Sequence, residues 1–230
     1  MRSFSATCWF RLLSALPCRQ PSEKEVRKHE KYNHKRYHYP YTITLVSGGL
    51  LGLVYQVTKE PIAQQEELAK QEAYQAVFED ADSFEVCVEE GDTEISQYLA
   101  DNGFANQTVN EVMEAKDASG ETIGYALNMT TSEGYGGDIT FSMGVQLDGT
   151  LNGISILTIN ETAGLGMNAT DESFKGQFSN KNVESFTVTK TGASADNEIN
   201  AISGATITSD AITGGVNAGL CAFNYVKEGE

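Results

Sequence analysis

The chain has 230 residues, enough for one domain with a substantial core and additional terminal segments. Charge is distributed unevenly: residues 1–40 carry nine of the sixteen Lys and Arg, whereas residues 41–230 hold seven bases against twenty-nine acids, a net charge of −22. This acidic balance excludes the body of the chain as a typical nucleic-acid binder, because a phosphate backbone requires a basic surface.

The cysteines argue against a metal centre. Cys8 and Cys18 lie in the basic N-terminal stretch, and Cys87 and Cys221 lie in the acidic body. No CxxC pair occurs, so zinc or iron–sulfur ligation within the chain is not expected. Cys87 and Cys221 are expected to be buried thiols, with a disulfide between them as the alternative.

Residues 1–36 are predicted to form a basic cytoplasmic arm, with an over-extended gene start as the alternative for this stretch. The short apolar patch within it is interrupted by charge and is too short to span a bilayer. His29, His34 and His38 have no structured frame around them, so a metal site among them is not expected.

Residues 37–58 contain no formally charged side chain and are predicted to form a transmembrane helix, because about 20 such residues cross the hydrocarbon layer. The basic residues Lys31, Lys35 and Arg36 precede this run and predict a cytoplasmic N-terminus with the body outside. A buried core helix and a cleaved signal peptide are the alternatives. A core helix would rarely stay uncharged for so long, and no A-x-A-like cleavage site follows, so an uncleaved single-pass anchor in the cell membrane is favoured.

Residues 59–82 are predicted to form a stalk helix. Pro61 can open a helix at its first turn, where its missing N–H costs nothing. Residues 62–79 are rich in Gln, Glu, Ala and Leu, which favour helix, and the acidic residues from Asp80 to Asp82 are expected to end it.

Residues 83–230 are predicted to form an extracytoplasmic α+β domain, in which helices pack against an antiparallel sheet. Alternating apolar and polar residues predict strands at residues 84–88, 109–116, 121–131, 139–147 and 151–159. Turn residues join these strands at 117–120 and 148–149. Shorter elements are predicted at 94–99 (helix or turn), 174–178 (helix or loop), 185–189 (strand) and 192–197 (turn).

Two loops in this domain are rich in glycine: the GYGG loop, residues 133–138, and the GLG loop, residues 161–168. Glycines at this density allow a flat ligand to approach the backbone, or simply serve turns. Neither loop has the spacing of a dinucleotide or Walker motif.

The motif segment, residues 203–209 with the sequence SGATITS, precedes a helical pattern. Apolar residues at spacings of three and four from Ile212 to Phe223 predict a last amphipathic helix that starts near Ser209. Thr208 or Ser209 is the expected N-cap.

A helix start offers free N–H groups and a positive dipole end, both of which favour a phosphate. No Lys or Arg lies between Lys190 and Lys227, although a site that captures phosphate by charge pairing normally recruits one. A covalently attached phosphate therefore fits the motif segment better than a captured one, with a plain capping turn as the alternative.

The residues Ser203-Gly204-Ala205-Thr206 resemble the flavinylation motif of the FMN-binding domain. This domain occurs in the G subunit of the Rnf electron-transport complex and in the C subunit of the sodium-pumping NADH:quinone reductase. The resemblance implies that Thr206 is esterified through the FMN phosphate by a separate flavin transferase. The family often has an acid three residues before the motif, where this chain has Asn200.

The GYGG and GLG loops are similar to the family's GYGG and ETPGLG loops, in the same order, with Asp138 and Ala163 in place of two prolines. The resemblance implies that both loops line the isoalloxazine ring. We expect Tyr135 to stack on the ring and Leu165 to pack on its dimethylbenzene edge. The expected cofactor-binding residues are Thr206, as the attachment point, with Ser203, Gly204, Ala205, Thr208, Glu161, Thr162, Gly164, Leu165, Gly166, Tyr135 and Gly136.

Residues 50–62 also resemble the membrane exit of the Rnf G subunit, so the similarity extends over roughly residues 42–226. It implies a membrane-anchored flavoprotein with covalent FMN that relays electrons, together with other membrane subunits, in an ion-translocating ferredoxin:NAD oxidoreductase complex. The body has no histidine after His38 and no visible nucleophile–base pair, as expected for a carrier whose cofactor does the chemistry. Two alternatives stay open: a stand-alone membrane-anchored flavoprotein that reduces external acceptors, and a membrane-anchored binding domain without flavin.

Overall fold

The computed structural model describes residues 23–89 and 91–228, and the chain divides into two compact units, residues 1–62 and 63–230. Helix α1, Glu23–Val77, contributes residues to both units. The predicted basic arm up to residue 22, and the side chains of the three histidines, lie outside the described residues.

Within the described residues, one helical segment, Tyr41–Val77, is long and apolar enough to cross a membrane, and its most apolar window has a mean hydropathy of 1.2 with none of it buried. The sequence predicts a new helix at Pro61, but α1 continues through Pro61 and ends at Val77. The residues after Pro61 are rich in Gln, Glu, Ala and Leu, and these helix formers continue the helix past the one backbone hydrogen bond that a proline removes.

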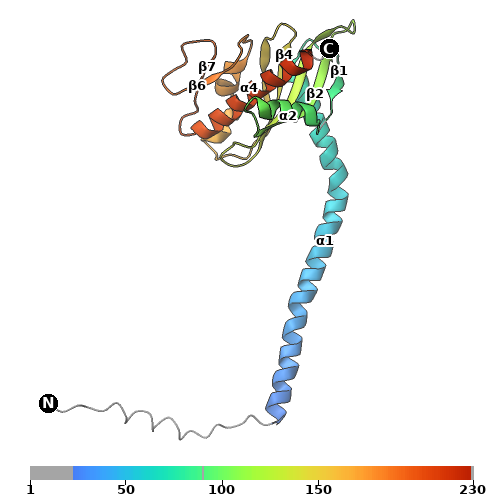
Figure 1. The fold of residues 1–230 in the computed structure, drawn as a ribbon. Helices are drawn as coiled ribbons and strands as arrows, with labels where there is room; N and C mark the ends of the chain where they lie inside the picture. Colours follow the sequence, from blue (N-terminus) through green and yellow to red (C-terminus); the bar gives the residue numbers. More distant parts are fainter. Residues whose placement is uncertain (1–22, 90, 229–230) are drawn as a thin grey trace, which may run out of the picture. The chain divides into compact units, whose positions relative to one another are not determined.

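The second unit is built around an antiparallel sheet with strand order β1-β2-β3-β4-β5, which confirms the predicted α+β class (Figure 1). Each strand pairs with its sequence neighbour, and tight turns at Gly120 and Gly149 adopt φ values of 82° and 88°, which glycine adopts at little cost. The strands are β1 (Ser83–Val88), β2 (Gln107–Lys116), β3 (Thr122–Thr131), β4 (Ile139–Gln146) and β5 (Leu151–Thr158).

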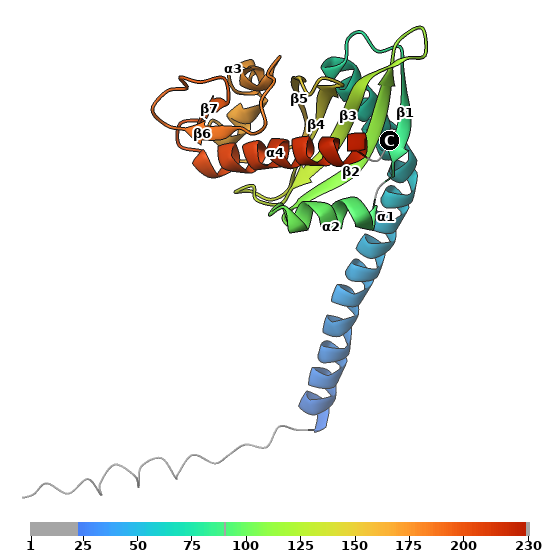
Figure 2. The same cartoon turned by 45° about the horizontal axis from the view of Figure 1, so that its top comes forward.

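Helix α4, Thr206–Glu228, crosses one face of the sheet, with α2, Thr93–Asp101, beside it (Figure 2). The main core lies between α4 and this face. Gly219 allows the close approach, because a Cβ there would lie 2.1 Å from the sulfur of Met143. Gly219 therefore lets α4 pack closely on this face of the sheet.

The opposite face of the sheet receives the end of α1 and the residues that follow it. Phe78 is buried, and its ring lies against Gly124 of β3 and Gly144 of β4. A Cβ on Gly124 would lie 2.7 Å from the ring, and a Cβ on Gly144 would lie 2.9 Å from it. The Asn152 side chain donates a hydrogen bond of 2.9 Å to the Val77 carbonyl. The end of α1 is therefore part of the fold of the second unit.

We expect Phe78→Ala to lower the free energy of unfolding of the second unit by about 3–5 kcal/mol, because a buried ring is replaced by a cavity. Chemical denaturation of the detergent-solubilised protein, followed by circular dichroism, measures this loss. Val86→Ala is the control: Val86 is 56% exposed on β1, so the change should stay within about 0.5 kcal/mol. An equal effect of the two substitutions would contradict the burial of Phe78 in this sheet face.

Short elements connect β5 to α4. They are η1 (Gly166–Thr170), α3 (Glu172–Lys175), η2 (Gly176–Phe178), β6 (Thr187–Thr189) and β7 (Glu198–Asn200). Strands β6 and β7 pair in parallel and lie beside α4 in Figure 1. The sequence predicts the first of these strands but not β7, because three residues are too few to show an alternating pattern.

The expectation of two buried cysteines is wrong for Cys87, which is exposed on the edge strand β1. Cys221 lies on α4 and is partly buried, which raises the pKa of its thiol. The alternative, a disulfide that joins Cys87 to Cys221, does not form.

Candidate functional site

The motif segment forms the turn into α4 and the first turn of that helix. Gly204 adopts a φ of 77°, and the Ala205 N–H donates to the Ile202 carbonyl over 2.9 Å, which closes the turn. Helix α4 then begins at Thr206. Gly204 therefore serves a left-handed position that other residues rarely adopt.

The N-cap expected at Thr208 or Ser209 is a wrong prediction, because both residues lie inside α4. The Ser209 hydroxyl accepts a hydrogen bond of 2.9 Å from the Ile202 N–H and donates one of 2.9 Å to the Ala205 carbonyl. The Ser209 side chain, which lies within α4, therefore connects the helix to Ile202 and Ala205 in the segment that precedes it. Thr208 also lies within the helix, and its side chain is buried, at 1% exposed.

The first turn of α4 presents backbone donors. Ser209 is the first residue of the helix whose N–H reaches an acceptor among the described residues, the Ala205 carbonyl at 3.1 Å. The N–H groups of Thr206, Ile207 and Thr208 precede it, as at any helix start. They lie at the positive end of a 23-residue helix, and no Lys or Arg occurs from Thr191 to Val226.

The GYGG and GLG loops touch each other. The Gly136 N–H donates a hydrogen bond of 3.2 Å to Oε1 of Glu161. The approach is backbone to backbone as well, because a Cβ on Gly136 would lie 1.9 Å from the carbonyl oxygen of Asn160. Within the GLG loop, the N–H groups of Leu165 and Met167 both donate to the Thr162 carbonyl, so this loop is a compact turn.

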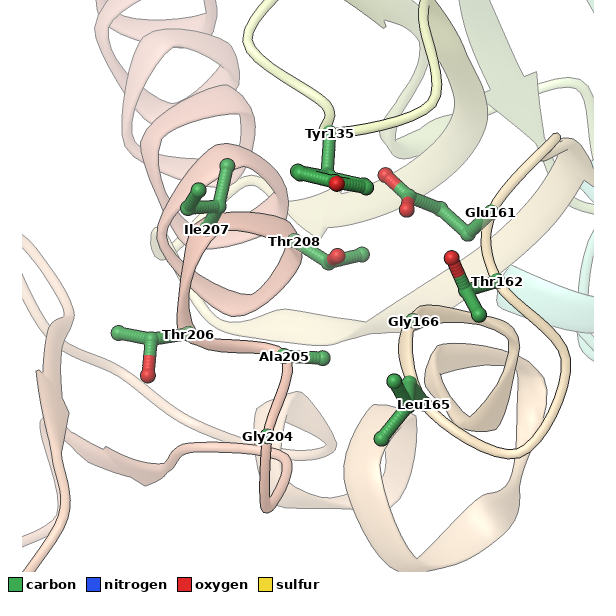
Figure 3. A pocket seen from close by; sticks show the side chains of 10 residues that line it. All are labelled: Tyr135, Glu161, Thr162, Leu165, Gly166, Gly204, Ala205, Thr206, Ile207 and Thr208. Atoms are coloured by element: carbon green, nitrogen blue, oxygen red, sulfur yellow. The ribbon is translucent and has the colours of Figure 1, made fainter.

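The two loops and the start of α4 surround one pocket of about 590 Å³ (Figure 3). Ten residues line it: Tyr135, Glu161, Thr162, Leu165, Gly166, Gly204, Ala205, Thr206, Ile207 and Thr208. Nine of these are residues that the sequence singles out. Gly136, Gly164 and Ser203 do not line the pocket; Gly136 supports it by bonding to Glu161.

Apolar side chains stand exposed at this pocket. Tyr135 is 71% exposed, Ile207 54% and Leu165 41%. Sequence reasoning missed Ile207, because a helix start near Ser209 would have left it in the preceding turn. In Figure 3, Thr206 and Ile207 lie at the side of the helix away from Glu161 and Thr162.

Local hydrogen bonds hold the segment before the motif. The Asn200 side chain accepts a hydrogen bond of 2.6 Å from the Ala193 N–H, so it has a structural role at the position where the resemblance leads us to expect an acid.

Two carboxylates in the same segment have lowered pKa values. A hydrogen bond donated by the Ser194 N–H is the main cause that lowers the pKa of Glu198, and a hydrogen bond from Lys181 lowers the pKa of Asp196. Folding contributes stability through such carboxylates at neutral pH, and this contribution is lost as the pH falls through their lowered pKa values.

Two family models match this chain. A family model of the FMN-binding domain matches residues 134–220, which include all ten lining residues, and a model of the RnfG N-terminal region matches residues 42–77. A solved structure, the C subunit of the Na(+)-translocating NADH-quinone reductase from Parabacteroides distasonis, is 19% identical with a TM-score of 0.48, covering 71% of this chain and 94% of that one.

Two curated relatives are more similar in sequence. The chain is 36% identical over 176 residues to the G subunit of the proton-translocating ferredoxin:NAD(+) oxidoreductase complex of Clostridium ljungdahlii, covering 76% of this chain and 83% of the relative. It is 30% identical over 189 residues to the G subunit of the ion-translocating oxidoreductase complex of Methanosarcina acetivorans, covering 82% and 91%. These similarities span most of both relatives and confirm the resemblance seen in the motifs: the chain belongs to the family of Rnf complex G subunits, membrane-anchored proteins with an FMN-binding domain.

Proposed function

We propose that this subunit carries one FMN, esterified through its phosphate to Oγ1 of Thr206, and relays electrons outside the cytoplasm within an Rnf-type complex. A separate flavin transferase attaches the FMN. The observation that carries the proposal is the position of Thr206: it is the first residue of α4, and it lines the pocket that the two glycine loops share.

The pocket fits FMN in size and in lining. Sites for ligands of this class have volumes of about 300–1,000 Å³, and this pocket has about 590 Å³. Tyr135, Leu165 and Ile207 offer apolar surface that a flat ring system would cover. Thr206 is only partly buried, so its hydroxyl is reachable from solvent.

The start of α4 suits a phosphate ester in particular. A phosphodiester keeps one negative charge, which the free N–H groups of Thr206, Ile207 and Thr208 and the helix dipole can stabilise. The absence of Lys and Arg from 191–226 and the net charge of −22 over 41–230 argue against holding a free, doubly charged flavin phosphate by charge alone. A covalent bond removes that requirement.

Bound FMN supplies the redox chemistry, and the chain supplies position and environment. In this proposal Thr206 holds one end of the cofactor and Tyr135 stacks on the flat ring system, which the 71% exposure of Tyr135 at the pocket supports. Leu165 and Ile207 shield apolar surface from water. Glu161 holds the GYGG loop through Gly136.

The rest of the proposal concerns the complex and the membrane. The relatives named above are subunits of ion-translocating oxidoreductase complexes, which supports other Rnf-type membrane subunits as partners for this chain. The positive charges of Lys31, Lys35 and Arg36, ahead of the apolar part of α1, support a cytoplasmic N-terminus and an extracytoplasmic FMN domain.

Expression with and without a flavin transferase tests the proposal. With the transferase present, a fluorescent band of the subunit should survive a denaturing gel, and without it the band should be dark. Fluorescence that disappears on denaturation in both cases would show bound but unattached flavin. A subunit that is dark under native conditions in both cases would contradict the flavin function itself.

A further inference from the structure

Two buried polar atoms without a hydrogen-bond partner lie on neighbouring strands of the sheet. They are Nδ2 of Asn128, on β3, and Oγ of Ser142, on β4, and neither has a partner among the described residues. Asn128 is 1% exposed and Ser142 is 0% exposed, and the two residues are directly opposite each other in the ladder. Because a single unsatisfied buried group is already costly, two of them at one place point to a bound molecule.

The two residues lie on the face of the sheet that receives the end of α1, opposite to α4 (Figure 2). Side chains of a strand alternate between the two faces, so Asn128 and Ser142 share a face with Ala126 and Gly144, two positions away. Ala126 packs in one cluster with Phe78, and a Cβ on Gly144 would lie 2.9 Å from the Phe78 ring. The polar pair therefore borders the apolar contact between the end of α1 and the sheet.

Tyr74 of α1 reaches the sheet beside this pair. The Tyr74 hydroxyl donates a hydrogen bond to the carboxylate of Glu111, and Glu111 is opposite Asn128 in the ladder between β2 and β3. Tyr74 is itself 3% exposed. The neighbourhood of Asn128 is therefore closed by a helix side chain rather than open to solvent.

The hydrogen bonds of Asn110 orient the Asn128 amide. The Nδ2 group of Asn110 donates to Oδ1 of Asn128 over 2.8 Å and to Oγ1 of Thr130 over 2.9 Å. This network assigns the oxygen of the Asn128 amide to the side of β2 and leaves its Nδ2 without an acceptor. Opposite residues of an antiparallel pair have Cβ atoms about 4.5–5.5 Å apart. Nδ2 of Asn128 and Oγ of Ser142 are thus close enough for one small bridging molecule, although no direct hydrogen bond joins them.

Ser155 of β5 continues the row. It is directly opposite Ser142, it is half-buried, and among the described residues its hydroxyl has no recorded hydrogen bond. We call Asn128, Ser142 and Ser155 the polar row. Together they offer one amide donor and two hydroxyls, and about three hydrogen bonds are what a buried water molecule usually makes.

The chemistry of the polar row selects the bound molecule. A cation is excluded next to Nδ2 of Asn128, because an amide N–H group needs an acceptor. An anion would need a base beside it, but Lys70, at this end of α1, is already paired with Glu111 at 3.2 Å. Water is neutral and both accepts and donates. We propose that one buried water molecule accepts the Nδ2–H of Asn128 and bonds to Oγ of Ser142, with Ser155 as its third partner.

This hydration site goes beyond the proposed flavin function and does not depend on it. It joins β3, β4 and β5 next to the place where Tyr74 bonds to Glu111. The contact between the end of α1 and the sheet then has two parts, an apolar one at Phe78 and a hydrated one at the polar row.

A structure of the flavin-free, detergent-solubilised full chain, at a resolution that shows ordered water, tests the site directly. We expect one water molecule within about 2.6–3.2 Å of both Nδ2 of Asn128 and Oγ of Ser142. A direct hydrogen bond between these two side chains, or no density between them, would overturn the proposal.

The stability of Ser142→Ala supplies a second test, because the sign of the change separates the two cases. If water bridges the row, the variant removes a bonded hydroxyl, and the midpoint of urea unfolding should fall. If the Ser142 hydroxyl is unsatisfied, its removal takes away a buried penalty, so a midpoint that rises or stays the same would contradict the water site.

Ser119→Ala is the matched control, because it removes the same hydroxyl from an exposed position in the turn between β2 and β3. Its midpoint should equal that of the wild type. Both tests use protein produced without a flavin transferase. Their outcome therefore leaves the proposed FMN function untouched, and the failure of either idea can be distinguished from the failure of the other.

Discussion

Thr206→Val is expected to yield protein without covalent flavin, even when it is produced together with a flavin transferase. Valine has nearly the shape of threonine but no hydroxyl, so no phosphoester can form at this position. Among the described residues, Thr206 makes no recorded side-chain hydrogen bond, and it is only partly buried, so the free energy of unfolding should change by no more than about 0.5 kcal/mol. In-gel fluorescence and chemical denaturation measure the two quantities.

Thr208→Val is the matched control for this result. It removes the other threonine hydroxyl of the first turn of α4, but Thr208 is 1% exposed, whereas Thr206 is only partly buried at the first position of the helix. The band should therefore remain in Thr208→Val. A band that persists in Thr206→Val and vanishes in Thr208→Val would place the ester on the second threonine and contradict the account.

Gly136→Ala should have the second largest effect, because the GYGG and GLG loops meet at this residue. The added Cβ would lie 1.9 Å from the carbonyl oxygen of Asn160, which is backbone and cannot rotate away as a flexible side chain would. The loops must separate, and the Gly136–Glu161 bond is then lost. We expect a loss of about 1–3 kcal/mol in stability, as for other overpacked sites.

In flavin-loaded Gly136→Ala protein, the ester at Thr206 should still form, while the ring becomes loosely held. Its fluorescence under native conditions should approach that of free FMN, and its midpoint potential should move toward the free value. Asp138→Ala, in the same loop but exposed, should leave both quantities unchanged. Native fluorescence equal to that of the wild type in Gly136→Ala would show that contact between the loops does not hold the ring.

Much of the fold follows from local pattern. Strand β4 alternates apolar and polar residues, and turns such as Asp148-Gly149 join the strands from β2 to β5, so both their number and their antiparallel pairing could be predicted. The residues of the site could be predicted mainly because the motif segment and the two glycine loops resemble a family.

The start of α4 could not be predicted in the same way. Hydroxyl residues at Thr208 and Ser209 suggest an N-cap, but Ser209 bonds instead to Ile202 and Ala205 from inside the helix. That pairing depends on where the chain before the motif lies, which is a tertiary contact. The position of Ile207 at the pocket follows from the same shift of the helix start. The contact between Gly166 and Thr208 joins residues that lie 42 positions apart in the chain, so local pattern could not predict it either.

Peptide mass spectrometry of the protein from cells that contain a flavin transferase tests the ester at Thr206 most directly. No Lys or Arg lies between Lys190 and Lys227, so trypsin releases the whole motif segment within one peptide, residues 191–227. We predict that this peptide is heavier by the mass of FMN less one water and that fragmentation assigns the added mass to Thr206. An unmodified peptide, or an added mass on another residue, would contradict the account.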